Sequence, residues 1–443
     1  MSEIRVRFAP SPTGYLHIGS VRTALFNYLF ARSQGGDFLL RIEDTDLERS
    51  KPEFETEIIW SLEWLGFRTD GEVVKQSSHF DLYTRTAEEL VKQGKAFFSM
   101  EKGARAIVFK MPKLRVKFHD WVHGDIEFDT STFEDLALVK SDGSPTYNFA
   151  CVIDDHAMNI SHVIRGDDHI SNTPKQILLY QALGYSVPVF AHLPLIVGKD
   201  GTPLSKRHGD VSLHAYQDEG FLPQALLNYL ALLGWNPGGS REIFLFEELI
   251  QKFRMDQINS KSACFDHEKL KWLNGEHLRA MDVKTYEAEL VRFLKKDGSL
   301  EENSEENLVR HAGLLFKDRI KTFKEFVEQA DYFFKKELSF DPQAVKKYWN
   351  DAGVKENLTK FYSELEPVKF SDAASLEKKT REIASQLGLS AGALIHPLRV
   401  ALTGRSVSPG LFDLMMALGK DLVFKRLEYA IKHFVDVREK LCA

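Results

Sequence analysis

One continuous pattern of strand, loop, helix and strand occupies residues 4–42, IRVRFAPSPTGYLHIGSVRTALFNYLFARSQGGDFLLRI. Over residues 4–8 apolar side chains alternate with arginines, as in a strand, and the breaker cluster PSPTG at residues 10–14 ends that pattern. Residues 38–42 form a nearly continuous apolar run, which is typical of a buried parallel strand.

The connecting helix is indicated by residues 21–29, where apolar side chains recur at the spacing of one helix face. Ser20 is the expected N-cap, and Gly35 and Gly36 are the expected stop. The whole stretch therefore predicts a βαβ unit with a right-handed crossover, as in a doubly wound sheet.

A second unit of the same kind follows far downstream. Residues 163–165 and 189–197 have the composition of strands, and residues 172–183 that of a helix with a proline in its first turn. The intervening segment differs, because it contains short alternating strands such as residues 106–111 and 121–128. A parallel sheet interrupted by an inserted subdomain is the simplest account.

The composition narrows the class of protein. The chain has 443 residues, of which 43% are hydrophobic, and no apolar run is long enough to span a bilayer. The N-terminus lacks the apolar core of a secretory signal. The three cysteines, Cys151, Cys264 and Cys442, are far apart, which argues against a disulfide framework or a cysteine zinc cluster and favours a reducing compartment.

The net charge of −6 by itself argues against a nucleic-acid binder, but the charge is unevenly distributed. Residues 291–443 hold 26 Lys and Arg against 23 Asp and Glu, whereas the other 290 residues hold 32 against 41. This asymmetry is a weak indication of different partners for the two halves.

Candidate ligand-binding residues gather where the strands of the first unit end. In an open parallel sheet ligands bind at the carboxyl ends of the strands, and residues 10–14, residues 17–20 and Glu43 all belong there. A helix N-terminus suits phosphate, and Gly19 lets a ring or a ribose approach the backbone. A capped helix after an ordinary loop explains the same motif equally well.

Two further features carry charge. Lys206, in the segment LSKRHG at residues 204–209, could close over a polyphosphate, although a solvated basic loop is the commoner reason for such a segment. Arg7, Glu43 and Arg165 lie within or at the ends of apolar strands, where unpaired charge is costly. An acidic amino acid as ligand would satisfy all of them, and internal salt bridges would do so equally well.

Taken together, these segments resemble the class I aminoacyl-tRNA synthetases, and nearly the whole chain is similar to bacterial-type glutamyl-tRNA synthetases. The segments that carry the resemblance are residues 5–14, 17–20, 41–46, 145–148, 152–155, 163–166, 204–209, 397–404 and 408–412. The resemblance implies an α/β fold: a Rossmann-type catalytic domain with an inserted α+β acceptor-binding subdomain, followed by an all-α anticodon-binding region.

The domains implied by the resemblance have these bounds: residues 1–68 and 161–210 for the Rossmann catalytic domain, 69–160 for the inserted acceptor-end-binding subdomain, 211–290 for a helical stem-contact region, and 291–443 for the anticodon-binding region. The helical pattern from about residue 211 onward favours a glutamyl-type anticodon region, since glutaminyl-tRNA synthetases of the same lineage have a β-barrel there.

The resemblance also implies a two-step reaction. Glutamate attacks the α-phosphate of ATP to give glutamyl-adenylate, and the terminal ribose hydroxyl of tRNA-Glu then takes the glutamyl group. ATP, with Mg²⁺ that arrives bound to it, is the expected cofactor. The expected partners are tRNA, glutamate and ATP, and the chain is expected to act as a cytoplasmic monomer without a membrane partner.

The family's HIGH motif matches residues 17–20, with Ser20 in place of its last His, and the KMSKS loop matches residues 203–207, with Pro203 in place of its first Lys. The implied catalytic residues are His17 and Lys206. The residues implied to bind ATP are His17, Gly19, Ser20, Leu204, Ser205, Lys206 and Arg207.

The residues implied to bind glutamate are Arg7, Ala9, Ser11, Glu43, Tyr147, Cys151 and Arg165. Arg7 and Tyr147 would hold the side-chain carboxylate, and Arg165 a carboxylate. Glu43, Ser11 and the Ala9 carbonyl would hold the ammonium group. Cys151 stands where some relatives place an Asn. Two fixed guanidinium groups would reject the neutral side chain of glutamine.

The inserted segment departs from the family. Many relatives carry a zinc-binding cysteine cluster soon after the segment that matches residues 95–98, and this part is missing here, so neither zinc nor another metal site is expected. His119 and His123 are interpreted as exposed histidines rather than ligands. Arg399 and Arg405 are the implied tRNA-binding residues, through anticodon-loop or domain-packing contacts.

Two alternatives stay open. The chain could be a specialised copy that charges tRNA-Gln, or both tRNA-Glu and tRNA-Gln. It could also be a synthetase-like protein that binds tRNA without aminoacylation. The presence of His17, Gly19, Glu43, Arg165 and Lys206 argues against this second alternative.

Overall fold

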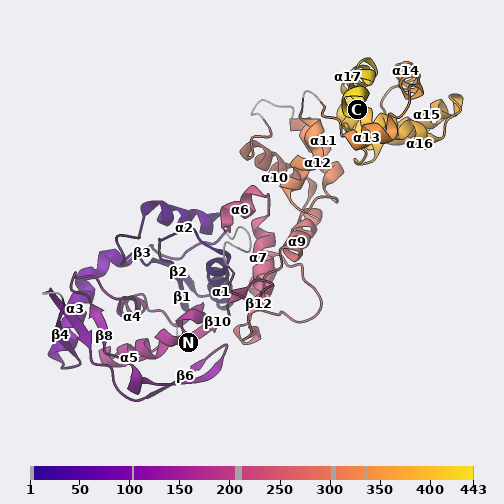
Figure 1. Cartoon of the computed structure of the whole chain (residues 1–443). Coiled ribbons are helices and arrows are strands. Elements are labelled where there is room, and N and C mark those ends of the chain that lie inside the picture. Colours follow the sequence, from indigo (N-terminus) through magenta and orange to yellow (C-terminus); the bar gives the residue numbers. More distant parts are fainter. Residues whose placement is uncertain (1–3, 102–103, 205–211, 301–305, 336–337, 443) are drawn as a thin grey trace. The chain divides into compact units, whose positions relative to one another are not determined.

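The computed structural model of the chain describes residues 4–101, 104–204, 212–300, 306–335 and 338–442 (Figure 1). Two compact units make up the chain. The N-terminal unit comprises Met1–Gln217 and Phe221–Leu273, and the C-terminal unit comprises Asp218–Gly220 and Asn274–Ala443.

The predicted first βαβ unit is confirmed. Its elements are β1 (Arg5–Phe8), α1 (Ile18–Gln34) and β2 (Asp37–Ile42), with β1 and β2 parallel. α1 ends as expected at Gly35, whose φ of 66° is left-handed. The predicted N-cap, Ser20, is wrong: the helix begins three residues earlier than expected, because His17 caps it and Ser20 lies in its first turn.

The second unit is also present, with one difference. Its elements are β9 (His162–Gly166), the short 3₁₀ helix η3 (Asp167–Asn172), α5 (Thr173–Leu183) and β10 (Val189–Leu193). The strand expected to reach Val197 is divided, because Pro194 has no N–H to continue the ladder. The remainder is β11 (Ile196–Val197), which pairs with β12 (Ala263–Cys264).

Within the N-terminal unit, the two βαβ units meet where the order of the strands reverses. One sheet has the order β1-β2-β3, with β3 at Val74–Lys75, and the other has the order β7-β6-β10-β9. β1 lies beside β9, and the N–H of Ser161 donates to the carbonyl of Arg5 at 3.0 Å. β2 pairs with β1 on one side of this junction and β10 pairs with β9 on the other, so the strand order runs in opposite directions from it. The junction is therefore a topological switch point, where doubly wound sheets bind ligands.

The segment between the two βαβ units forms an antiparallel sheet of its own and adds a hairpin to the sheet that contains β9 and β10. Its antiparallel sheet consists of β4 (Ala96–Glu101), β5 (Ala104–Phe109) and β8 (Leu136–Val139). The hairpin of β6 (Arg115–Asp120) and β7 (Gly124–Asp129) instead joins the parallel sheet, because β6 pairs with β10. The helices of this segment are α3 (Phe80–Lys92) and α4 (Tyr147–Ala157). The four predicted domain bounds remain predictions.

Helices complete the N-terminal unit and form the C-terminal unit. In the N-terminal unit these are α2 (Pro52–Trp64), α6 (Leu213–Asp218), α7 (Pro223–Leu232) and α8 (Phe246–Lys252), and α9 (His267–Ala280) continues into the C-terminal unit. The apolar face of α1 packs on α7 and α8.

The C-terminal unit is helical, as predicted. Its helices are α10 (Val283–Lys296), α11 (Glu306–Phe316), α12 (Phe323–Ala330), α13 (Pro342–Tyr348), α14 (Gly353–Leu365), α15 (Ala373–Gln386), α16 (Ala391–Thr403), α17 (Leu411–Lys432) and α18 (Phe434–Cys442). Within the parts of the chain that the structure describes, no helix combines the length and the apolar composition needed to cross a membrane.

Candidate active site

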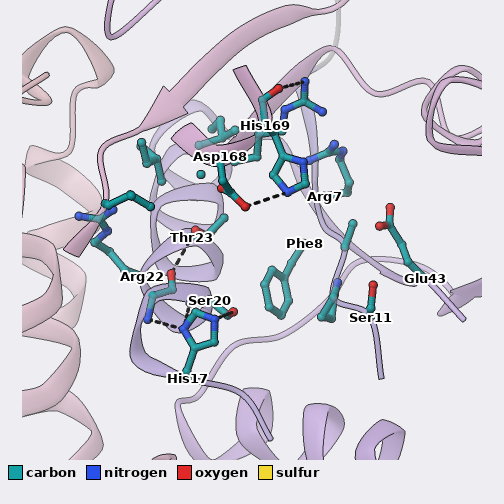
Figure 2. A pocket seen from close by; sticks show the side chains of 18 of the residues that line it. Arg7, Phe8, Ser11, His17, Ser20, Arg22, Thr23, Glu43, Asp168 and His169 are labelled. Carbon is teal, nitrogen blue, oxygen red and sulfur yellow. Dashed lines mark hydrogen bonds and ion pairs between the residues drawn. The ribbon is translucent and has the colours of Figure 1, made fainter. Parts of the chain in front are cut away.

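A pocket of about 490 Å³ opens at the switch point, where β1 and β9 end (Figure 2). Most of the side chains that the sequence singled out line it. The predicted residues among its lining are Arg7, Ala9, Ser11, His17, Gly19, Ser20, Glu43, Tyr147 and Arg165. The fold thus brings together residues that lie up to 158 positions apart in the sequence.

His17 is held at the start of α1 by its own helix. Its Nδ1 accepts hydrogen bonds from the backbone N–H groups of Gly19, at 3.1 Å, and Ser20, at 3.3 Å (Figure 2). Burial lowers the pKa of His17, although Asp168 acts to raise it, so the ring is neutral. Because Nδ1 accepts, the ring hydrogen lies on Nε2, 3.2 Å from Ser20 Oγ. The backbone N–H groups of Gly19 and Ser20, which the sequence suggested as phosphate donors, therefore donate to His17. The donor that this site offers to a ligand is the Nε2–H of His17.

Arg7 lies in a buried ion network. Its Nε is 3.0 Å from Asp155 Oδ1, and the same carboxylate oxygen is 2.5 Å from Arg41 Nη1. Arg41 also pairs with Glu43 at 2.9 Å. Burial acts to raise the pKa of Asp155, but Arg41 and Arg7 outweigh it and hold that pKa well below its usual range. Internal salt bridges, one of the two explanations left open by the sequence, therefore account for Arg7 and Glu43.

Arg165 differs from Arg7, because its partners are neutral. The guanidinium donates to His192 Nε2 at 3.1 Å, to Gln176 Oε1 at 2.8 Å and to Thr173 Oγ1 at 2.7 Å. Arg165 is only 5% exposed, and no carboxylate among the described residues forms an ion pair with it. A buried cation without an anionic partner creates a demand for an anionic ligand in the pocket.

Tyr147 and His169 form the wall beside Arg165. The Tyr147 hydroxyl lies 3.1 Å from His169 Nδ1. Burial raises the pKa of Tyr147, which keeps the phenol protonated, and burial together with Arg165 lowers the pKa of His169 to about 4. Both side chains are therefore neutral near pH 7, and the positive charge of Arg165 is not cancelled from this side.

Cys151 does not line the pocket. Its thiol is 1% exposed and lies behind Arg7, with Sγ 3.5 Å from Arg41 Nη2 and 3.5 Å from Asp155 Oδ2. Burial raises its pKa to about 12. The residue predicted to contact glutamate thus contacts the ion network that supports Arg7.

The KMSKS-like segment is described only at its start. Ser205, Lys206 and Arg207 lie outside the described residues. The backbone N–H of Leu204 donates to the carbonyl of Ile196 at 3.0 Å, and its side chain packs against the apolar core of the N-terminal unit.

Of the two histidines predicted to be exposed, His119 is exposed, whereas His123 is partly buried, and both have acidic partners. His119 lies 2.7 Å from Asp125, and His123 lies 2.8 Å from Asp167. Within the described ranges, no group of three or more His, Cys, Asp or Glu side chains is arranged to hold a metal ion. The expectation that the chain binds no zinc remains a prediction.

Arg399 lies in α16, and Arg405 lies in the loop between α16 and α17. Arg399 donates to the Pro409 carbonyl at 2.7 Å, and Arg405 pairs with Asp331 at 2.6 Å. A cavity of about 740 Å³ adjoins this loop in the C-terminal unit, and Arg405 and Pro409 are among its lining residues. Both arginines thus contact other residues of the C-terminal unit, and their assignment to tRNA binding remains a prediction.

The residues that support the pocket arginines are not among those predicted from the sequence. Asp155 and His192 are buried and contact Arg7 and Arg165 respectively, and the buried Arg41 shares Asp155 with Arg7. One available signal was Arg41, a charge inside an apolar strand, as Arg7 is. His192 gave no comparable signal, because a histidine within an apolar run is usually a packed core residue.

A parallel sheet with a pocket at its switch point and a His-Ile-Gly helix start define a class I aminoacyl-tRNA synthetase. The family described as "tRNA synthetases class I (E and Q), catalytic domain" matches residues 3–105 and 98–272, and "Anticodon binding domain" matches residues 278–431.

Similar proteins narrow this class. Glutamate–tRNA ligase 1 of Caldanaerobacter subterraneus is 40% identical, with 98% of each chain covered, and glutamate–tRNA ligase 2 of Koribacter versatilis is 42% identical, covering 97% of this chain and 98% of its own. The solved glutamate tRNA ligase of Elizabethkingia meningosepticum, in complex with its amino acid, has a TM-score of 0.88 at 33% identity, covering 97% of this chain and 99% of its own. The chain belongs to the glutamate–tRNA ligase family and has glutamate–tRNA ligase activity.

Proposed function

We propose that the pocket at the switch point binds glutamate next to ATP, forms glutamyl-adenylate and transfers the glutamyl group to tRNA-Glu. The observation that carries this proposal is Arg165, a buried cation on the pocket wall with only neutral partners among the described residues. A glutamate carboxylate supplies the missing anion.

Glutamate binds between groups of opposite charge. Arg7 and Tyr147 bind its side-chain carboxylate, and Arg165 binds a carboxylate. Glu43, Ser11 and the Ala9 carbonyl bind its ammonium group. All of these residues line the same pocket. Glu43 is ion-paired with Arg41 on one oxygen, so its second oxygen is available to the ammonium group. Cys151 supports Arg7 from behind.

Selection against glutamine follows from the same charges. Asp155 and Glu43 together balance Arg7 and Arg41, so the positive charge of Arg165 is the one left over in the free pocket. Glutamate has a net charge of −1 and balances it, whereas glutamine has no net charge and leaves the positive charge in excess. Leaving a buried charge unpaired costs several kcal/mol in typical proteins, roughly 3–5.

ATP lies along the start of α1. His17 donates from Nε2, Gly19 leaves room for the adenosine, and Ser20 contributes its hydroxyl. Leu204, Ser205, Lys206 and Arg207 also bind ATP, with Lys206 neutralising the phosphates. Mg²⁺ arrives with ATP as part of the substrate, and the acidic groups nearest the pocket, Glu43 and Asp168, fit contacts to a ligand rather than a resident metal cage.

The proposal extends to the partner and the state of the chain. tRNA is held through the C-terminal unit by Arg399, which donates to the Ser408 carbonyl, and by Arg405, which lines the cavity beside the loop between α16 and α17. The chain acts as a monomer in the cytoplasm. Light scattering coupled to gel filtration checks the monomer, which should give a mass near 50.6 kDa.

Charging assays with purified tRNA-Glu and tRNA-Gln test the proposed function. We expect ATP-dependent transfer of glutamate to tRNA-Glu. Transfer to tRNA-Gln alone would instead identify the specialised copy, and transfer to neither would leave only the tRNA-binding alternative.

The role of Lys206 is tested by Lys206→Ala, with Lys75→Ala as a matched surface control. Lys206→Ala should lower the rate of the ATP-dependent step at least about 100-fold, as for the loss of one charge-stabilising group in an active site. An unchanged rate would refute the assigned role.

A further inference from the structure

A chain of three buried side chains runs behind the pocket. Asp120 ends β6, His192 lies in β10 and Arg165 lies in β9, so three neighbouring strands of one sheet each contribute one member. His192 Nδ1 is 2.6 Å from Asp120 Oδ2, and Arg165 Nε is 3.1 Å from His192 Nε2. Asp120 and His192 are both fully buried.

The contacts of Asp120 assign the donor and the acceptor of each hydrogen bond in this series of three side chains. Asp120 accepts from the backbone N–H groups of Val122, His123 and His192, at 2.9, 3.0 and 3.1 Å. Burial acts to raise the pKa of Asp120, but the bonds from His192 and the backbone outweigh it and lower that pKa. Asp120 is therefore an ionised carboxylate that only accepts, and the hydrogen of His192 must lie on Nδ1.

His192 consequently presents a lone pair to Arg165. Burial lowers the pKa of His192 and Arg165 lowers it further, against the effect of Asp120, so the imidazole is neutral. With Nδ1 protonated, Nε2 can only accept, and it accepts from Arg165 Nε, while Thr173 Oγ1 lies 3.1 Å from the same nitrogen. The remaining contacts fix both terminal nitrogens, because Nη1 donates to Gln176 and Nη2 to Thr173.

The neutral acceptor His192 leaves the charge of Arg165 available to a ligand, which a carboxylate in its place would not do. Asp155 fixes Arg7 but also neutralises it. His192 fixes the orientation of the Arg165 guanidinium but does not neutralise its charge. The negative charge of Asp120 is not in contact with Arg165, because Asp120 accepts hydrogen bonds from His192 and from backbone N–H groups. The guanidinium stays rigid and remains positively charged for a ligand.

We propose that His192 and Asp120 are positioning residues for the ligase reaction, holding Arg165 in the orientation that binds a carboxylate of glutamate. This inference rests on the proposed glutamate pocket. It also gives the β6–β7 hairpin a part in substrate selection, because Asp120 comes from the middle of the segment between the two βαβ units.

Two variants of His192 separate its two hydrogen bonds. His192→Asn keeps a donor near Nδ1 for Asp120 but cannot reach Arg165, whereas His192→Gln keeps an acceptor near Nε2. In charging assays with saturating ATP and tRNA-Glu, His192→Asn should raise the KM for glutamate about 10-fold, as for the loss of one hydrogen bond to a charged group. His192→Gln should restore the KM to within about threefold, and the KM for ATP should change in neither variant.

A double-mutant cycle with Arg165→Ala makes the inference specific. If His192 acts through Arg165, His192→Asn should add nothing once Arg165 is removed. An equal effect of His192→Asn in both backgrounds, or an equal loss of affinity for glutamate and ATP, would show a merely structural role and overturn the proposal.

The cycle also distinguishes this inference from the proposed function beneath it. Arg165→Ala alone should lower kcat/KM for glutamate about 100-fold or more. An unchanged value would remove Arg165 from the glutamate site and so overturn the proposed pocket. A large effect of Arg165→Ala with normal kinetics of His192→Asn would overturn only the positioning role. Should His192→Asn fail to fold, Asp120→Asn, which removes the carboxylate that fixes the tautomer of His192, is measured in the same cycle and has to show the same non-additivity.

Discussion

Arg7 and Arg165 of the pocket have partners of a different kind from those of Arg426 and Arg399 of the C-terminal unit. In the N-terminal unit, Arg7 and Arg165 are held by side chains, a carboxylate in one case and an imidazole, an amide and a hydroxyl in the other. In the C-terminal unit, Arg426 is held by backbone carbonyls, those of Leu402 and Tyr332, and Arg399 donates to the Pro409 carbonyl.

The difference separates two uses of the same residue type. A guanidinium bonded to carbonyls joins segments of backbone, and its loss mainly affects stability. A guanidinium fixed by side chains on the wall of a pocket is oriented toward a ligand, and its loss mainly affects binding. The comparison predicts effects of different size and kind in the two units, and the variants below are ordered from the largest expected effect to the smallest.

The largest effect is expected from Asp155→Asn. This change leaves Arg7 and Arg41 buried without their shared carboxylate, and breaking a buried ion pair from one side typically costs about 3–5 kcal/mol of folding free energy. Urea unfolding followed by tryptophan fluorescence measures it, since five of the six tryptophans belong to the N-terminal unit. Asp331→Asn, at a partly exposed pair with Arg405, is the matched control and should cost far less.

Acid unfolding gives a second measure of the same carboxylate. The pKa of Asp155 is lower in the folded chain than the value of about 3.9 that an unfolded Asp has. Its stabilisation is therefore fully present well above pH 4 and is lost as the pH falls below about 4. Asp155→Asn should flatten this part of the stability profile. A variant profile as steep as that of the wild type would mean that Asp155 is not the paired group.

A smaller but more specific effect is expected from Arg7→Ala. It should lower kcat/KM for glutamate about 100-fold, or about 2.7 kcal/mol, while the KM for tRNA stays within twofold. Arg7→Lys should recover little, because a lysine cannot reproduce the fork that spans Asp155 and the pocket. Normal glutamate kinetics in Arg7→Ala would show that Arg7 does not bind glutamate. That result would refute the distinction between arginines that bind a ligand and arginines that stabilise the fold.

Arg405→Ala tests the other side of the comparison. Arg405 donates to the carbonyls of Glu328 and Gln329 at 2.9 and 3.1 Å, and it is about one third exposed. Its loss should lower the unfolding free energy of the C-terminal unit by about 1–2 kcal/mol, measured by far-UV circular dichroism, and weaken tRNA binding. The KM for glutamate should not change, and a change would contradict the division of roles.

The smallest effect is expected from Glu377→Ala. Glu377 pairs with Arg381 one turn along α15, and both side chains are largely in water. Such exposed pairs contribute about 0.3–0.5 kcal/mol. The circular dichroism melt of this variant should be close to that of the wild type, which sets the lower limit for the effects above.

The sequence predicted the frame of the pocket well, because that frame depends on local patterns. Alternating residues 4–8 and the apolar run at 38–42 marked two strands, and charged residues within such strands marked Arg7, Glu43 and Arg165 as unusual. Because the carboxyl ends of parallel strands lie at the same edge of a sheet, these local patterns are enough to predict that the three residues lie close together.

The supporting residues could not be predicted in the same way. Asp120 and His192 are 72 positions apart, and their contact depends on β6 pairing with β10, which no local pattern indicates. Ser20 was predicted as the N-cap from its residue type, but His17 precedes it and reaches the same amides. Cys151 was placed by resemblance at the ligand, whereas its short side chain leaves it behind Arg7.

The thiol of Cys151 has a practical consequence for chemical labelling. The N-terminal unit contains two cysteines, and thiol reagents need both access and a thiolate. Cys151 is buried and its pKa is raised to about 12, whereas Cys264 is exposed on β12. A maleimide dye therefore attaches to this unit at Cys264, beside β11, and leaves the arginine network unmodified.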